Sequence, residues 1–187
     1  MHEEIIISGF GDQGALFAGQ LLAYAALDVG KHVTWIPSYG PEMRGGTAHC
    51  TVVISDDPIG SPLVRHPSTA IVLNQPSFEK YEPLVRPGGL LIYNSSLIDA
   101  RPARQDIRYI AVPANLVAEQ LGNVRQANVV LLGTFLAATA ILPLAAVEAA
   151  LEAHLPEHQR RYLGSNKTAL RQGATFALTP VNYSGGD

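Results

Sequence analysis

Three glycines near the start of the chain have a spacing that binds phosphate groups in many nucleotide enzymes. Gly9, Gly11 and Gly14 form a G-x-G-x-x-G pattern between an apolar run at 4–8 and a helix-like segment. In a dinucleotide site such glycines allow a tight turn and a close approach of the backbone, and the helix N-terminus attracts the pyrophosphate. The pattern therefore makes nicotinamide or flavin binding the first chemistry to consider.

Two features around the glycine turn argue against that cofactor. A dinucleotide site needs an acidic residue at the end of the next strand, about 20 residues on, to bind the ribose. That strand ends in TWIPSYG without a carboxylate, and Asp28 falls too early, inside the first helix. Asp12 places a negative charge in the turn, where it either repels a phosphate or caps the helix. The structural alternative is that the glycines only permit a tight turn that packs against another segment.

A second loop, Ser38–Gly46, carries side chains suited to a charged ligand or a partner. Arg44 can bind a carboxylate or phosphate with its guanidinium fork, or it can pair with Glu42 inside the loop. Met43 is an adaptable contact residue, and the two glycines after Arg44 permit close backbone approach. In a parallel sheet this loop follows the carboxyl end of a strand, on the same edge as the glycine turn. Ligands bind at that edge.

Six motifs occur in an order that resembles a known family. They are GFGDQG, SYGPEMRGG, NQPSFEKY, NSSLI, VPAN and LGNVRQANVVLLG. Together they closely resemble the gamma subunit of 2-oxoacid:ferredoxin oxidoreductases and the corresponding domain of pyruvate:ferredoxin oxidoreductase. The resemblance runs from Ile5 to Leu170, and its most specific piece, YGPEMRGG, is similar to the 2-oxoglutarate, 2-oxoisovalerate and pyruvate branches. The family commonly has glycine at the position of Asp12, so this sequence departs there, which weakens the case that the turn binds an anion.

The resemblance implies a subunit of an enzyme that converts a 2-oxoacid and coenzyme A to acyl-CoA and CO2 while ferredoxin is reduced. It slightly favours 2-oxoglutarate as the substrate, followed by 2-oxoisovalerate or pyruvate. Thiamine diphosphate, Mg2+ and iron–sulfur clusters are expected on the partner subunits, alpha, beta and a ferredoxin-like delta, and no cofactor is expected on this chain alone. The single cysteine agrees, because an iron–sulfur cluster needs about four thiolates. The isolated chain is expected to be inactive.

The residues expected to face coenzyme A or a partner subunit come from the two glycine loops and two later segments. They are Gly9, Gly11, Gln13, Gly14, Tyr39, Gly40, Pro41, Glu42, Met43, Arg44, Gly45, Gly46, Asn94, Ser95 and Arg125. An Asx or Ser turn is the alternative for Asn94 and Ser95, and a solvated surface position is the alternative for Arg125. Helix capping is the simplest interpretation of Asn115, Asn123 and Asn128, and it is the preferred one for Asn123. No catalytic residue and no metal ligand is assigned.

Two other classes of function remain as alternatives. One is a free-standing NAD(P)-binding oxidoreductase that uses the glycine turn. The other is a ligand-free interaction module whose glycine loops only form tight interfaces. The histidines pair with no obvious nucleophile, and His49 and Cys50 are adjacent in an expected strand, so their side chains point to opposite faces. Cys50 is therefore interpreted as a buried small apolar residue.

Strands and helices alternate along the chain and position these residues. Strands are expected at 4–8, 32–38, 47–55, 69–74, 90–94 and 108–112, and helices at 15–29, 75–85, 113–122, 127–142, 144–154 and 159–172. Apolar runs without alternation suit strands that are covered on both faces. The pattern predicts a three-layer α/β/α fold with a largely parallel or mixed central sheet and a Rossmann-like start. One domain is expected over 1–180, with a flexible tail at 181–187.

The composition argues against nucleic-acid and membrane partners. The net charge of −3 implies no surface for binding a polyanion, and the first residues are acidic where a signal peptide is basic. The apolar segment 127–150 is long enough to cross a membrane, but Gly133 and Pro143 interrupt it and no basic clusters flank it. Buried helices are therefore the preferred interpretation, and a cytoplasmic location is expected.

Overall fold

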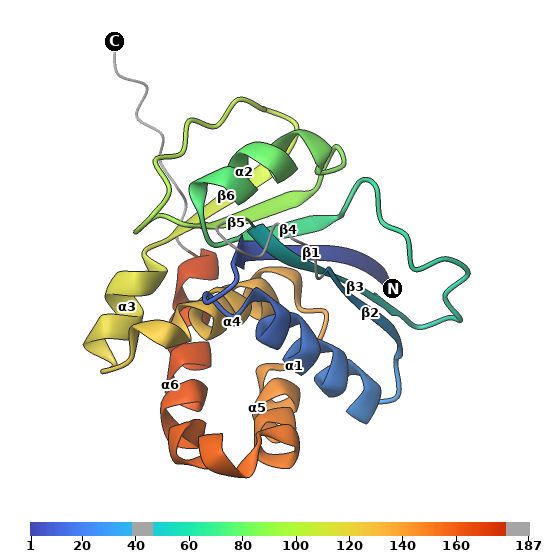
Figure 1. The fold of residues 1–187 in the computed structure, drawn as a ribbon. Helices are drawn as coiled ribbons and strands as arrows, with labels where there is room; N and C mark the ends of the chain where they lie inside the picture. Colours follow the sequence, from blue (N-terminus) through green and yellow to red (C-terminus); the bar gives the residue numbers. More distant parts are fainter. Residues whose placement is uncertain (39–46, 179–187) are drawn as a thin grey trace.

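The structure, a computed structural model, describes residues 1–38 and 47–178. Its centre is a six-stranded sheet with helices on both faces (Figure 1). The strands are β1 (His2–Phe10), β2 (His32–Ser38), β3 (Thr47–Ser55), β4 (Thr69–Val72), β5 (Leu90–Asn94) and β6 (Arg108–Val112). All six lie where the sequence predicts them. β1 is longer than the apolar run that predicts it, because its ends pair with β3 as far as His2 and Phe10.

The sheet is mixed, with the strand order β2-β3-β1-β4-β5-β6. The pairs β1–β4, β4–β5 and β5–β6 are parallel, whereas β3 is antiparallel to both β1 and β2. β4 and β5 are buried along their whole length, as expected for parallel strands covered on both faces. The predicted α/β fold with a largely parallel or mixed sheet is therefore confirmed.

Six α-helices connect or cover the strands in the described residues. They are α1 (Ala15–Asp28), α2 (Gln75–Tyr81), α3 (Ala114–Gln120), α4 (Ala127–Thr139), α5 (Leu144–His154) and α6 (Leu163–Ala174). Short 3-10 turns are η2 (Glu82–Leu84), η3 (Val124–Gln126), η4 (Glu157–Tyr162) and η5 (Thr175–Leu178). The helix predicted at 127–142 ends earlier because Ala140 adopts a left-handed φ of 51°. The helix predicted at 159–172 begins later, because η4 occupies its first turn.

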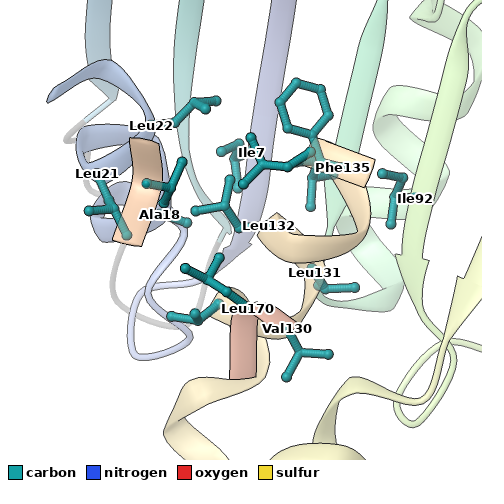
Figure 2. Close-up of a cluster of buried hydrophobic side chains, with 14 of the residues drawn as sticks. Ile7, Ala18, Leu21, Leu22, Ile92, Val130, Leu131, Leu132, Phe135 and Leu170 are labelled. Atoms are coloured by element: carbon teal, nitrogen blue, oxygen red, sulfur yellow. The ribbon is translucent and has the colours of Figure 1, made fainter. Parts of the chain in front are cut away.

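The two helical layers are unequal (Figure 1). α1, α4, α5 and α6 lie on one face of the sheet, and α2 lies on the other. The larger core is on the first face, where Leu131, Leu132 and Phe135 of α4 meet Ile7 of β1 and Ile92 of β5 (Figure 2). The smaller core packs α2 and the segments on either side of β5 against the second face. The predicted three layers are present, with most of the apolar burial on one side.

α4 is buried on all sides from Ala127 to Leu136. It crosses α6 closely, because a Cβ at Gly133 would overlap the carbonyl group of Leu170 and a Cβ at Gly173 would overlap that of Val130. The interpretation of the segment 127–150 as buried helices is thus confirmed for α4, whereas α5 is buried only at Val147, Ala150 and Leu151. Within the described residues, no helix combines the length and the apolar character needed to cross a membrane.

Candidate functional site

Five strands end at the same edge of the sheet. β1, β2, β4, β5 and β6 run in one direction, since β3 is antiparallel to both of its neighbours. We call this the carboxyl edge; its strand ends are Phe10, Ser38, Val72, Asn94 and Val112. The crevice beyond such an edge is the usual ligand position in open α/β sheets.

The residues that flank the second loop also lie at this edge. Thr47 pairs with Phe10 at the end of β1, and His49 pairs with both Ser8 and Ser38. Of the two residues beside the 39–46 loop, Thr47 therefore lies next to the glycine turn, and Ser38 lies one strand further away. The loop residues themselves fall outside the described residues, so their contacts stay a prediction: Tyr39, Gly40, Pro41, Glu42, Met43, Arg44, Gly45 and Gly46.

Gln13 closes the glycine turn from within. Its Oε1 accepts a hydrogen bond from the Phe10 amide at 2.7 Å, and its own amide donates to the Phe10 carbonyl at 3.0 Å. Its Nε2 donates to the carbonyl of Leu73 at 3.3 Å, which ties the turn to the residue after β4. The side chain of Gln13 thus fixes the shape of the turn, and it also lines the cavity described below.

Gly9 and Gly14 are required by the packing of the chain on itself. A Cβ at Gly9 would stand 2.8 Å from Gln13 Oε1 and 2.9 Å from Leu73 Cβ. Gly14 has a φ of 75°, and a Cβ there would overlap the side chain of Asn128. These contacts are those of the structural alternative, a tight turn packed against other segments.

Asp12 does not cap the first helix. Gly14 is the N-cap residue of α1, and in the described part of the chain no side chain accepts a capping hydrogen bond there. The carboxylate of Asp12 is exposed instead. The capping interpretation is therefore wrong, and the negative charge of Asp12 remains free to oppose an anion at the turn.

A cavity of about 520 Å³ opens between the glycine turn and the start of α4. Gln13 and Arg125, both expected at the site, line it together with Asp12, Asn115 and Val124. Arg125 is exposed, and its backbone amide donates to Asn123 Oδ1 at 3.1 Å. That bond confirms the predicted cap at Asn123 and holds Arg125 at the cavity. The cavity thus combines one guanidinium, one carboxylate, two amides and apolar walls.

Asn94 and Ser95 differ in their exposure. Asn94 is fully buried, and its Oδ1 accepts from the amides of Ser96 and Ala114, both at 3.2 Å. Its Nδ2 donates to Asn115 Oδ1 at 2.8 Å, so this residue adopts the Asx turn that was the alternative and anchors α3 to β5. Ser95 is exposed at the same edge, where it remains available to a ligand or a partner.

The sequence reasoning missed two asparagines that shape the site. Asn128 Nδ2 donates to the carbonyl of Gly14 at 3.0 Å. Asn115 Oδ1 accepts a hydrogen bond from Asn94 Nδ2, and Asn115 also lines the cavity. Both follow a helix start, where capping is the ordinary expectation. A polar side chain beside an apolar run indicates a hydrogen bond within the fold. The partner could not be identified from the sequence, because it lies 114 residues away for Asn128 and 21 for Asn115.

The topology also decides against the dinucleotide alternative. In a dinucleotide-binding domain the second strand lies beside the first and parallel to it, so that its acidic end faces the glycine turn. Here β3 is inserted between β1 and β2, and β2 ends at Ser38 without a carboxylate. The strand, turn and helix at the start of the chain are as predicted. The second strand, which would bind the ribose in a dinucleotide site, is not adjacent to β1.

Cys50 is fully buried on the α1 side of β3, as interpreted from the sequence. Burial raises the pKa of its thiol from 9.0 to about 12, and its Sγ lies 3.5 Å from the carbonyl of Ala15. The ring of His49 lies near that of Tyr81, with centroids 5.9 Å apart. His49 and Cys50 thus belong to opposite faces of the sheet. Among the described residues, no group of three or more His, Cys, Asp or Glu side chains is placed to hold a metal ion.

The chain belongs to the pyruvate ferredoxin/flavodoxin oxidoreductase family, whose sequence profile matches residues 4–176. A solved keto/oxoacid ferredoxin oxidoreductase gamma subunit from Geobacter sulfurreducens PCA has the same fold, with a TM-score of 0.84 and 31% identity. The match covers 95% of this chain and 97% of that one. The resemblance stated from the six motifs is therefore confirmed.

Two curated relatives differ in length. The ketoisovalerate oxidoreductase subunit VorA of Methanothermobacter marburgensis is 44% identical over 131 residues, 70% of this chain and 27% of that protein. The 2-oxoglutarate synthase subunit KorC of Methanocaldococcus jannaschii is 34% identical over 160 residues, 84% of this chain and 86% of that protein. The chain thus spans about a quarter of the VorA relative and most of the KorC relative.

Proposed function

We propose that this chain is the gamma subunit of a 2-oxoacid:ferredoxin oxidoreductase. In that role it supports the conversion of a 2-oxoacid and coenzyme A to acyl-CoA and CO2 with reduction of ferredoxin. One observation carries the proposal: the glycine turn, Arg125 and the residues on either side of the 39–46 loop all lie at the carboxyl edge. This arrangement supports a surface that completes a site on other subunits.

Coenzyme A is the ligand proposed for the cavity. Its pantetheine arm is amide-rich, which suits Gln13 and Asn115 in the cavity, and its phosphates suit the exposed guanidinium of Arg125. Arg44 of the second loop, two residues from Glu42 in the sequence, is proposed to supply a second guanidinium. Asp12 limits how close a phosphate comes to the turn, so Arg125 rather than the turn amides is proposed to hold the anion.

The redox and decarboxylation chemistry is proposed to reside on partner chains. Thiamine diphosphate with Mg2+ and iron–sulfur clusters would be held by alpha, beta and ferredoxin-like delta subunits, and ferredoxin itself would be an indirect partner. This chain has one cysteine, and that thiol is buried with a raised pKa, so it is unsuited to ligate a cluster. The same assignment implies a cytoplasmic enzyme that is active only as the assembled complex.

Co-expression with the proposed thiamine-binding and ferredoxin-like subunits tests the assignment. The complex should co-purify and reduce ferredoxin in a reaction that needs coenzyme A. Replacing Arg125 by Ala should raise the KM for coenzyme A about tenfold while kcat stays within twofold, because a binding contact is lost uniformly. Arg86→Ala is the matched control, since Arg86 is exposed and follows η2 at the opposite edge of the sheet.

The loop variants Glu42→Ala and Arg44→Ala should likewise impair assembly or raise the KM for coenzyme A. Wild-type assembly and wild-type KM in all three variants would overturn the assignment of this edge. If no complex forms with the wild-type chain, the proposed function itself fails.

The substrate is proposed to be 2-oxoglutarate or 2-oxoisovalerate. The KorC relative, which matches the chain over most of its own length, supports the first, and the VorA relative, which has the higher identity, supports the second. We favour 2-oxoglutarate slightly, with pyruvate as the third candidate. Comparing kcat/KM for the three acids in the assembled complex decides among them, and equal values would contradict a selective enzyme.

A further inference from the structure

The cavity at the glycine turn presents hydrogen-bonding groups that the fold holds in place. Four polar side chains line it: Asp12, Gln13, Asn115 and Arg125. Its volume of about 520 Å³ lies within the range of about 300–1,000 Å³ that is usual for small-ligand pockets. An amide side chain offers either its oxygen or its nitrogen to a ligand, and the bonds that hold the amide in the fold determine which.

Asn115 offers a donor. Asn94 Oδ1 accepts from the backbone amides of Ser96 and Ala114, so Asn94 Nδ2 is the donating end of that side chain. Nδ2 donates to Asn115 Oδ1 at 2.8 Å, which engages the oxygen of Asn115 within the fold. Among the described residues, no group accepts a hydrogen bond from Asn115 Nδ2. The end of Asn115 that is left for a ligand is therefore its NH2 group.

Asp12 offers an acceptor. The oxygen of Gln13 is already engaged by the Phe10 amide, whereas the carboxylate of Asp12 is exposed and does not cap α1. Arg125 lines the same cavity, yet within the described part of the chain no ion pair joins it to Asp12. A carboxylate accepts hydrogen bonds only, and a guanidinium donates only. The cavity thus holds one available acceptor and separate donors for a ligand.

The walls beside these polar groups are apolar. Phe10 and Val124 both line the cavity, and they keep 39% and 44% of their surface exposed although both side chains are large and hydrophobic. Aliphatic groups of a ligand would cover this surface, which favours binding. A ligand that fits has a group that both donates and accepts, set between aliphatic segments, and an anionic group for Arg125.

We propose that Asp12 and Asn115 bind one secondary amide of the pantetheine arm of coenzyme A, an inference that rests on the proposed function. The N–H of this amide donates to the carboxylate of Asp12, and its carbonyl oxygen accepts from Asn115 Nδ2. The aliphatic groups on either side of the amide pack on Phe10 and Val124, and the phosphates lie toward Arg125. Asp12 is then a specificity-determining residue, because it accepts from the amide and repels a phosphate, which offers only negatively charged oxygens.

Fragments from the two ends of coenzyme A test this role of Asp12 in the complete complex. Asp12→Ala should raise the Kd of pantetheine about tenfold, because the amide loses its acceptor. The same variant should lower the Kd of adenosine 3′,5′-bisphosphate at least twofold, because a repelling charge is removed. Opposite changes are not expected of a residue that only shapes the turn. Asp57→Ala is the control for the lost charge, since Asp57 is exposed and follows β3 at the opposite edge of the sheet; both Kd values should stay within twofold of wild type.

Asn115→Asp reverses the polarity of the second contact. The substituted side chain keeps an oxygen that accepts from Asn94 Nδ2, so α3 stays anchored, but it turns an acceptor toward the carbonyl of the ligand. The Kd of pantetheine should rise at least tenfold. Gln120→Glu is the matched control, because it makes the same change from amide to carboxylate on α3, at an exposed position outside the cavity. It should bind pantetheine within twofold of wild type.

The outcomes separate this inference from the proposed function. If the wild-type complex uses coenzyme A but Asp12→Ala and Asn115→Asp bind pantetheine like wild type, the inference is overturned while the subunit assignment stands. The inference is also overturned if Asp12→Ala changes both Kd values in the same direction, or if the wild-type complex binds coenzyme A but not pantetheine. If no complex forms, or the complex does not need coenzyme A, the proposed function has failed and the inference with it.

Discussion

The side-chain amide of Asn128 donates a hydrogen bond to the carbonyl of Gly14, 3.0 Å away and 114 residues earlier in the chain. The bond joins the start of α4 to the N-cap of α1, so the glycine turn is held by a helix that is buried from Ala127 to Leu136. A side chain at Gly14 would overlap Asn128 and would also have to adopt a φ of 75°. The last glycine of the fingerprint is thus explained by contacts within the chain.

Gly14→Ala should therefore destabilise the chain by about 2 kcal/mol, from left-handed strain and from displacement of Asn128. Urea unfolding of the isolated chain measures this loss. Gly60→Ala is the control, because a Cβ there meets no atom within 4 Å and its φ lies outside the left-handed region. Equal stability of the two variants would contradict the packing role of Gly14.

The crossing of α4 and α6 leads to a second prediction. A Cβ at Gly173 would overlap the Val130 carbonyl, and the hydroxyl of Thr134 donates to the Gly173 carbonyl at 2.7 Å. Gly173→Ala should cost about 3 kcal/mol, since two backbones must separate. Gly164→Ala, in the same helix and with open space around its Cβ, should be neutral or slightly stabilising. Thermal unfolding of both variants checks this, and a stable Gly173→Ala chain would refute the close crossing.

The order of the elements was predictable because most strands contain short apolar runs and several helices begin or end beside Gly or Pro. β2 and β3 were each located correctly from such runs. Their placement was not predictable, because insertion of β3 between β1 and β2 depends on pairing between residues far apart in sequence. A local pattern is equally compatible with the parallel order of a dinucleotide-binding domain.

The site was predictable in part, for the same reason. Gln13 and Arg125 were expected at one edge and do line one cavity. Asn94 was expected with equal weight to bind a ligand or to form a turn. Only the positions of Ala114 and Asn115, 20 and 21 residues later, show that the turn uses its whole amide. A polar side chain at a strand end has several local options, and tertiary contacts select among them.

The thiol of Cys50 should be unreactive in the folded chain. Burial raises its pKa to about 12, so almost no thiolate forms near pH 8, and labelling by a thiol reagent should follow unfolding. An unfolded thiol ionises near the ordinary value of 9.0, so unfolding releases a proton between about pH 9 and 12 and the chain loses stability as pH rises through this window. Labelling rates with and without urea between pH 7 and 9 test this. Fast labelling of the folded chain that rises tenfold per pH unit would contradict burial.

Asp56 should contribute stability that disappears in acid. Its carboxylate accepts hydrogen bonds from Lys31 Nζ at 2.5 Å and from the amino group of Met1 at 2.9 Å, and these partners lower its pKa from 3.8 to about 2. Between about pH 4 and 2 the unfolded chain therefore binds more protons than the folded chain, so stability falls as pH falls through this window. Asp56→Asn should be less stable than wild type at pH 6, and the difference should shrink toward zero near pH 2. Urea titrations at pH 6, 4, 3 and 2 measure it, with Asp57→Asn as the neighbouring control, because no ion pair of Asp57 occurs among the described residues. A difference that stays constant with pH would show that Asp56 acts through shape and not through its charge.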